Sequence, residues 1–214
     1  DGANLALSPD GSQLVYVSVQ ANTQQLFLRP LDSLEARPLP GTEGASVPFF
    51  SPDGQWVGFF AGGKLKKIAV SGGSPLTICD AAIVRGAAWA PDNTIYFAPS
   101  SISGLFKVSA QGGAPQPFTK LDPQKGEVSH RWPQVLPGGK AILFTVWTGP
   151  GYDENQIQLQ IVESGERRVV VPNGQTGVYM PPGYVVYHSR TESALLAIPF
   201  DLERLETTGS APVT

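Results

Sequence analysis

The hydrophobic positions of this chain fall in short runs, separated by segments in which Gly, Pro, Asp and Ser recur. Several runs are apolar at successive positions, as in residues 15–17 and 56–60. A strand with one solvated face would alternate hydrophobic and polar residues, so these runs are typical of strands that are covered on both faces. The pattern predicts an all-β protein built from short, buried strands.

One tetrapeptide recurs at intervals of about 43 residues and divides the chain into five units. Ser8-Pro9-Asp10-Gly11 returns unchanged at 51–54 and in modified form at 90–93, 136–139 and 180–183. Pro presets φ for a tight turn, Asp bonds the local backbone, and Gly adopts the left-handed conformation that ends the turn. We therefore expect a hairpin corner between the first and second strands of each unit. The fourth and fifth units lack the Asp, which predicts looser corners there.

Each unit also contains four hydrophobic runs. First strands are expected at 5–7, 47–50, 87–89, 133–135 and 178–179, and second strands at 14–19, 56–60, 94–98, 141–147 and 184–188. Third strands are expected at 25–29, 64–70, 104–108, 156–162 and 194–200, and fourth strands at 36–39, 75–78, 114–119, 167–171 and 211–214.

A four-stranded unit that can solvate neither face must stack against copies of itself, and radial stacking gives a β-propeller. The predicted fold is an all-β, five-bladed β-propeller of four-stranded antiparallel blades. It forms a single domain over residues 1–214, with units at about 1–42, 43–80, 81–126, 127–173 and 174–214. An open β-sandwich is the alternative, but sandwiches do not repeat one turn at one position of every unit.

Composition narrows the range of partners. The 24 Gly and 20 Pro disfavour long helices, and a net charge of −3 gives no basic footprint for nucleic acid. The single Cys79 excludes an internal disulfide. No apolar run approaches the length of a membrane span, and the chain opens on Asp1-Gly2 without a leader-like segment. We expect no nucleic-acid binding and no membrane insertion of this segment.

The sequence lacks the common motifs for cofactor and metal chemistry. The sequence contains no phosphate-binding loop, no GxGxxG after a strand, no GxSxG elbow, and no HExxH or CxxC. Two separated histidines and one cysteine make a poor ligand set for a transition metal. We therefore predict no cofactor, no metal site and no catalytic residues.

The tetrapeptide repeat resembles the WD40-like, TolB-type propeller repeat, in which an SPDG hairpin follows the innermost strand of each blade. Residues 29–32, 39–45, 58–61, 64–68, 129–133 and 199–201 are most similar to the propeller found C-terminal to many bacterial serine/threonine protein kinases. The resemblance covers essentially the whole chain. It implies an extracytoplasmic sensor or protein-interaction module of a larger bacterial signalling protein, with no catalysis of its own.

Two departures from this family limit what the resemblance implies. The chain has no glycine-rich phosphate loop and no HRD or DFG sequence, so no phosphoryl transfer is expected from it. The family's propellers commonly have six or more blades, whereas five units are present here. Either five blades close, or these blades are part of a larger ring.

The candidate site lies in the loops at the blade end opposite the corners, because variable loops usually carry function. Five residues before each tetrapeptide stand Ala3, Ser46, Arg85, Arg131 and Gln175, which predicts a polar ring at the mouth of the central channel. The predicted ligand-binding residues are Arg85, Glu127, His130, Arg131, Glu43 and Gln175. Such groups pair with carboxylates or with the polar groups of a peptide, so a protein or peptide partner is predicted and a small molecule or sugar is an alternative.

Each of these residues also has a structural interpretation. Arg and Glu at strand starts often tie neighbouring blades together. His188 is expected to be an ordinary rim residue, Trp132 to pack between blades, and Lys64, Lys66 and Lys67 to form a solvated strand edge.

A glycosidase is the enzymatic alternative, because five-bladed propellers can set two carboxylates across a central cleft. Its acid and base would have to come from Glu43, Glu127 and Asp1.

Overall fold

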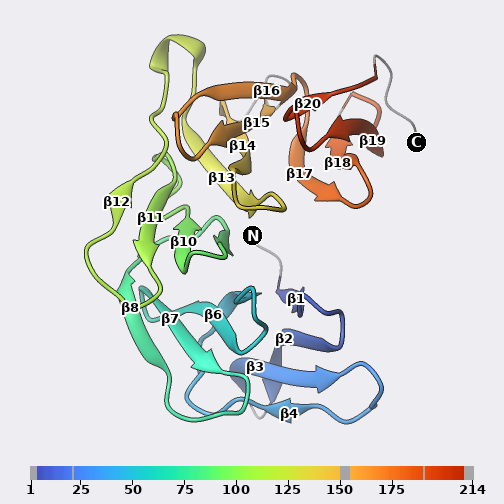
Figure 1. Cartoon of the computed structure of the whole chain (residues 1–214). Helices are drawn as coiled ribbons and strands as arrows, with labels where there is room; N and C mark the ends of the chain where they lie inside the picture. Colours follow the sequence, from blue (N-terminus) through green and yellow to red (C-terminus); the bar gives the residue numbers. More distant parts are fainter. Residues whose placement is uncertain (1–3, 21, 150–154, 190, 210–214) are drawn as a thin grey trace. The chain divides into compact units, whose positions relative to one another are not determined.

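A computed structural model describes residues 4–20, 22–149, 155–189 and 191–209. Within these residues the chain forms five four-stranded antiparallel sheets, each built from strands that are consecutive in the sequence (Figure 1). The only helical element in the described part is a short 3-10 helix, η1 (Pro123–Lys125). The all-β, five-bladed prediction is confirmed.

The sheets consist of the following strands. The first contains β1 (Leu5–Leu7), β2 (Gln13–Gln20), β3 (Thr23–Pro30) and β4 (Arg37–Pro38). The second contains β5 (Ser46–Phe50), β6 (Trp56–Ala61), β7 (Lys64–Ala69) and β8 (Leu76–Asp80). The third contains β9 (Ala87–Trp89), β10 (Thr94–Phe97), β11 (Phe106–Ser109) and β12 (Gln116–Pro117). The fourth contains β13 (Ser129–Val135), β14 (Ala141–Trp147), β15 (Gln156–Ile161) and β16 (Arg167–Val171). The fifth contains β17 (Gln175–Met180), β18 (Tyr184–Ser189), β19 (Ala194–Asp201) and β20 (Glu206–Thr207).

The observed strands overlap the predicted ones except at the end of the chain. The fourth strand of the fifth unit was expected at 211–214, which lies outside the described residues. In the structure this role belongs to β20, which pairs with the end of β19.

The corners form as their chemistry predicts. The amide of Gly54 donates to the Ser51 carbonyl at 2.9 Å, and the Ser51 hydroxyl and the Gln55 amide both donate to Asp53 Oδ1. These bonds lower the pKa of Asp53, with the Ser51 hydroxyl as the main cause. The corner at 136–139 lacks the Asp but keeps the same backbone bond, from Gly139 to Leu136 at 2.9 Å. The looser turn expected in the fourth unit is therefore not seen in its backbone.

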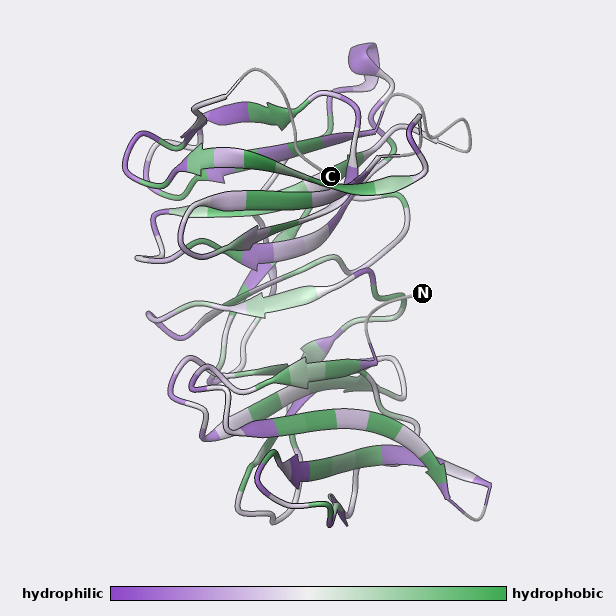
Figure 2. Ribbon diagram, turned by 90° about the vertical axis from the view of Figure 1, so that its right-hand side faces the viewer, coloured by the Kyte–Doolittle hydropathy of each residue, from purple (hydrophilic) through white to green (hydrophobic). Residues whose placement is uncertain are grey.

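The five repeats fall into two larger compact units. The first compact unit contains residues 1–100 and 106–116, and the second contains residues 101–105 and 117–214. In the first unit, apolar side chains fill the space between neighbouring blades, and Val57, Phe59 and Phe60 are buried on both faces of β6. In the second unit, Leu143 and Val185 belong to one core between the fourth and fifth blades. Hydrophobic residues gather along the strands, and the connecting turns are mostly hydrophilic (Figure 2).

Lys67 does not belong to the solvated edge that the sequence suggested. It is 6% exposed, and its ammonium lies 4.7 Å from the ring centre of Trp56 and 6.0 Å from that of Trp89. Desolvation lowers the pKa of this lysine. The expectation was wrong for Lys67 because its neighbours come from the adjacent strand and the adjacent blade, which strand alternation does not reveal.

Candidate functional site

The predicted polar position precedes the same backbone distortion in three blades. The pairing of the first strand with the second shifts register after Ser46 in β5, after Arg131 in β13 and after Gln175 in β17. The next residues, Val47, Trp132 and Thr176, have φ of 50°, 51° and 56°. Such β-bulges turn a strand and redirect its side chains, and a β-branched or bulky residue with positive φ is strained.

This bulge was missed by the sequence analysis, although one signal was present. The corresponding residue of the third unit is Gly86, which has φ of 102°. Glycine is the residue that adopts this conformation without strain. Val, Trp and Thr at the same position of the other units conceal the requirement, because their preference for extended backbone predicts an ordinary strand.

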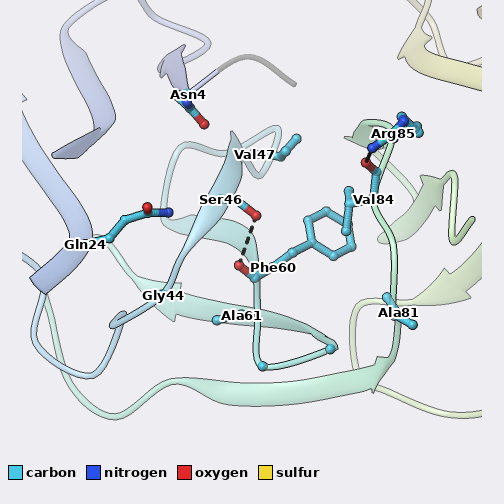
Figure 3. Close-up of a pocket in the computed structure, with 13 residues that line it drawn as sticks. Asn4, Gln24, Gly44, Ser46, Val47, Phe60, Ala61, Ala81, Val84 and Arg85 are labelled. Atoms are coloured by element: carbon cyan, nitrogen blue, oxygen red, sulfur yellow. Dashed lines mark hydrogen bonds between the residues drawn. The ribbon is translucent and has the colours of Figure 1, made fainter. Parts of the chain in front are cut away.

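The loop end of the first compact unit contains a hollow of about 420 Å³ (Figure 3). It lies at the start of β5, opposite the Ser51–Gly54 corner, between the 81–85 segment and the turn that joins β6 to β7. Asn4 and Gln24 lie on one side of it and Arg85 on the other. Gln24 Nε2 donates to the Ala45 carbonyl at 2.7 Å. The lining is therefore polar and is assembled from three different blades.

Arg85 and Glu43 are the two predicted site residues of this unit. Within the described residues, Arg85 forms no ion pair, and the one hydrogen bond of its side chain runs from Nη1 to the Val84 carbonyl at 2.9 Å. Glu43 is exposed, and its Oε1 accepts from the Gly41 amide at 3.2 Å. Glu43 does not line the hollow, whereas Arg85 does.

In the second compact unit, Glu127 and His130 belong to a buried hydrogen-bond network. The side chain of Glu127 is 2% exposed, and Arg167 of β16 binds both of its oxygens, at 2.5 and 3.1 Å. Glu127 Oε2 also accepts from the Asp122 amide at 2.7 Å and lies 3.1 Å from His130 Nε2. Arg167 extends the network to the Gln158 side chain and the Lys120 carbonyl.

The partners of His130 determine which ring nitrogen carries the proton. An ionised carboxylate can only accept, so Nε2 must be the protonated nitrogen that donates to Glu127. His130 Nδ1 therefore accepts from the Thr119 hydroxyl, 2.6 Å away, and Thr119 Oγ1 in turn accepts from the Leu105 amide at 2.7 Å. In this run of hydrogen bonds from Leu105 through Thr119 and His130 to Glu127, each donor therefore meets an acceptor.

Both ionisable groups have shifted pKa values. Burial opposes the charged form of Glu127, but hydrogen bonds from His130 and Arg167 outweigh it and lower the pKa of the carboxyl to about 2. Burial lowers the pKa of His130, although its bond to Glu127 acts in the opposite direction. At neutral pH Glu127 is therefore ionised and His130 is neutral.

A hydroxyl, an imidazole and a carboxylate in sequence are also the parts of a nucleophilic triad. Here Thr119 is 5% exposed and His130 is fully buried. A substrate carbonyl cannot reach a hydroxyl that is enclosed and already bonded on both sides. Glu127 is likewise unable to exchange a proton with a sugar, because both of its oxygens are engaged. This arrangement ties segments 103–105 and 119–122 to the fourth blade.

Arg131 follows this network directly and is half-buried. Its Nε donates to Ser129 Oγ at 2.7 Å, and its guanidinium lies 4.1 Å from the ring centre of Trp147 and 6.0 Å from that of Trp132. Gln175 lies in the fifth blade, with its amide 3.3 Å from Nδ1 of the half-buried His188. The structure thus brings Glu127 and His130 together, and places Arg131 on an aromatic ring. Asp1, the remaining carboxylate considered above, lies outside the described residues.

The described part of the chain has neither a metal-ligand cluster nor a membrane-spanning helix. It contains no group of three or more His, Cys, Asp and Glu residues that could hold a metal ion. It also contains no helix that is both long enough and apolar enough to cross a membrane.

No family model matches the sequence, and no curated protein matches it significantly. Solved structures do match its fold. TolB from Acinetobacter baumannii has a TM-score of 0.72 and 18% identity over 92% of this chain and 52% of its own length. An oligogalacturonate lyase from Vibrio parahaemolyticus has a TM-score of 0.72 and 14% identity over 98% of this chain and 64% of its own. A puromycin-hydrolyzing peptidase from Mycobacterium tuberculosis has a TM-score of 0.70 and 11% identity over 99% of this chain and 38% of its own.

These similarities establish a TolB-like β-propeller fold. The chain spans about half the length of the TolB structure that it matches. The prediction that this chain is not an enzyme, which rested on absent motifs and on the family resemblance, is contradicted because a lyase and a peptidase share its fold. Catalysis depends on the site that a fold carries, so a propeller fold gives no ground for excluding it.

Proposed function

We propose that this chain is a recognition module that binds a protein or peptide partner through the loop end of its blades. The observation that carries the proposal is the contrast between the two blade ends. A groove of about 760 Å³ also lies beside the Gly54 corner, but the corner side chains Ser51 and Asp53 are bonded to one another. At the loop end, by contrast, Arg85 lines the polar hollow and forms no ion pair within the described residues. A concave site with a few convergent polar groups is the usual form of a binding site.

Within this proposal the predicted residues take two roles. Arg85, Arg131, Glu43 and Gln175 are the candidate contacts for a partner at the loop end. Glu127 and His130 have a supporting role, because their hydrogen bonds hold the segment that leads into Arg131. Buried, fully bonded networks of this kind keep nearby groups in one geometry.

The biological setting that we propose is an extracytoplasmic sensor or interaction part of a larger bacterial signalling protein. Its support is the resemblance of segments such as 39–45 and 129–133 to the propellers that follow bacterial serine/threonine kinases. A saccharide is the second candidate ligand. It is favoured by the similarity in fold to an oligogalacturonate lyase, whose name denotes an acidic sugar polymer as its substrate.

Peptide selection with two matched substitutions tests the proposal. A random peptide library is selected on the purified chain, and the recovered peptides are measured by fluorescence anisotropy. Ala82→Trp places a bulky ring at the exposed rim of the hollow, whereas Gln55→Trp places the same ring at an exposed position of a corner. We expect Ala82→Trp to weaken binding by about tenfold or more and Gln55→Trp to leave it unchanged. Loss of binding in Gln55→Trp alone would contradict the proposal.

A further inference from the structure

We infer that the hollow of the first unit binds a carboxylate, held by Arg85, and that the carboxylate belongs to a peptide, either at its C-terminus or on an acidic side chain. This inference rests on the proposed function and specifies its ligand chemistry. The charge of the lining is its first support. Arg85 is the only charged residue among those that line the hollow in the described part of the chain.

Among the described residues, no acidic side chain of the surrounding loops neutralises Arg85. Glu43 is adjacent to Gly44 of the lining, but its Oε1 binds the Gly41 amide. Asp80 precedes Ala81 of the lining, and it forms an ion pair with Lys64 at 2.6 Å. The Arg85 guanidinium therefore offers N–H donors in a planar fork, which matches the two oxygens of a carboxylate.

The backbone holds Arg85 at this rim before any ligand arrives. Its amide donates to the Ala98 carbonyl at 3.2 Å, and the Gly86 carbonyl accepts from the Ala98 amide at 3.1 Å. Gly86, with φ of 102°, turns the chain directly after Arg85. A side chain that is carried on a fixed backbone loses less entropy on binding, so the site is partly preorganised.

The other polar groups of the hollow suit a peptide backbone. Gln24 Nε2 is bonded to Ala45, which leaves Oε1 to accept, and the Ser46 hydroxyl directed at the Phe60 carbonyl retains its own lone pairs. Gly62 and Gly63 of the turn between β6 and β7 have no side chains and line the hollow with backbone atoms. A peptide presents N–H and C=O groups in alternation and can use both kinds of partner.

A sugar ring fits this lining less well. Sugars present a hydrophobic C–H face that packs against an exposed aromatic ring. Phe60 is the only aromatic residue among the described residues of the lining, and it is 2% exposed. The hollow therefore offers hydrogen bonds and one cation but no aromatic platform, and we assign it to a peptide carboxylate.

The test uses the full chain and the peptides selected on it. Each peptide is resynthesised with a free C-terminus, with a C-terminal amide, and with its Asp and Glu replaced by Asn and Gln. Affinities are measured by fluorescence anisotropy for the wild type, Arg85→Gln and Arg85→Lys. Arg37→Gln is the matched control, because Arg37 is an exposed arginine of the same unit that lines a separate groove beside the Gly54 corner.

We expect Arg85→Gln to weaken binding by about tenfold to a hundredfold, the range for a hydrogen bond between charged groups. Arg85→Lys should fall in between, since an ammonium keeps the charge but not the fork. Removing the relevant carboxylate from the peptide should reduce the affinity of the wild type as much as Arg85→Gln does, and should not reduce the affinity of Arg85→Gln any further. Salt should weaken binding to the wild type more than binding to Arg85→Gln. The two modified peptides identify whether the carboxylate is terminal or on a side chain.

Three results would overturn the inference, and they are distinguishable from one another. If Ala82→Trp blocks the peptides but Arg85→Gln does not, the carboxylate assignment fails while the proposed function stands. If Arg37→Gln or Gln55→Trp abolishes binding instead, both fail. If no selected peptide binds but a uronate trisaccharide does, and Arg85→Gln weakens it, the occupant is a sugar. Unchanged unfolding midpoints of the variants exclude misfolding as the cause.

Discussion

Arg85 and Arg131 occupy the same position in the third and fourth units, five residues before the corner tetrapeptide, yet their surroundings differ. Arg131 is bonded to Ser129 and stacked on Trp147, and it follows the network of Glu127 and His130. The side chain of Arg85 has one hydrogen bond, to the carbonyl of the residue before it, and lines an open hollow. Equivalent sequence positions thus hold an arginine that is fixed by its neighbours in the fourth repeat and an arginine with a single local hydrogen bond in the third.

The difference shows that the role of such an arginine is set by its neighbours in space and not by its position in the repeat. Glu127 is matched by Arg167, which lies 40 positions further along the chain. Nothing comparable is bonded to Arg85 among the described residues. Substitution of Arg131 should therefore lower the stability of the fold more than substitution of Arg85 does.

Breaking the Glu127 network should have the largest effect. Arg167→Ala leaves the buried carboxylate of Glu127 without its counter-ion, and removing one partner of a buried pair costs about 3 to 5 kcal/mol. Urea unfolding followed by circular dichroism measures this loss. Arg168→Ala is the control from the next position of β16, where an exposed pair with Glu166 contributes about 0 to 1 kcal/mol. Equal losses in the two variants would show that the network is not the support that we describe.

A direct comparison of the two equivalent arginines should give an intermediate effect. Arg131→Ala removes a hydrogen bond to Ser129 and the stacking on Trp147, which together contribute about 1 to 2 kcal/mol. Arg85→Ala should change the free energy of unfolding by no more than about 0.5 kcal/mol, since its side chain supports little of the fold. The same urea titrations measure both. A larger loss in Arg85→Ala than in Arg131→Ala would reverse the comparison.

Acidification should lower the stability of the second compact unit gradually. Burial lowers the pKa of His130, so below about pH 6.5 the unfolded chain binds a proton that the folded chain does not. The stability linked to His130 is present above that pH and falls by at most about 1.4 kcal/mol per pH unit below it. Glu127, with its pKa lowered to about 2, adds a further loss as the pH falls from about 4.5 towards 2.

Urea midpoints between pH 7 and pH 5 measure the histidine component. His130→Gln should be less stable at neutral pH and should lose less stability on acidification than the wild type. His188→Gln is the control, because it changes the other histidine of the chain and leaves the network intact. If His130→Gln retained the wild-type slope, the linkage to His130 would be refuted.

Much of the fold could be predicted because its signals are local. The Ser-Pro-Asp-Gly corner needs only neighbouring residues, and the bonds of Asp53 to Ser51 and Gln55 span two positions each. Buried strands such as 56–60 were equally visible, since they are apolar at successive positions. The bulges were not predicted, because Val47, Trp132 and Thr176 favour extended backbone and only packing holds them at positive φ.

The candidate site was only partly predictable. Glu127 and His130 were both among the predicted ligand-binding residues, but their engagement by Arg167 and Thr119 joins segments that are distant in the sequence and could not be inferred from spacing. Lys67 was assigned to solvent because Trp89, which helps to enclose it, belongs to another blade. Catalysis was excluded because known motifs are absent and because the resembled family has no catalysis of its own, but a lyase and a peptidase share this fold and show that neither ground suffices.

The sequence by itself determined the five units, their corners and the order of their strands, because turn chemistry and hydrophobic runs act over a few residues. Only the tertiary structure decided which polar residues are consumed in support and which are left for a ligand. The physical reason is that a buried charge must be paired, and its partner can come from any strand that packs nearby. Arg167 neutralises Glu127 in this way, and Arg85 stays available at the hollow.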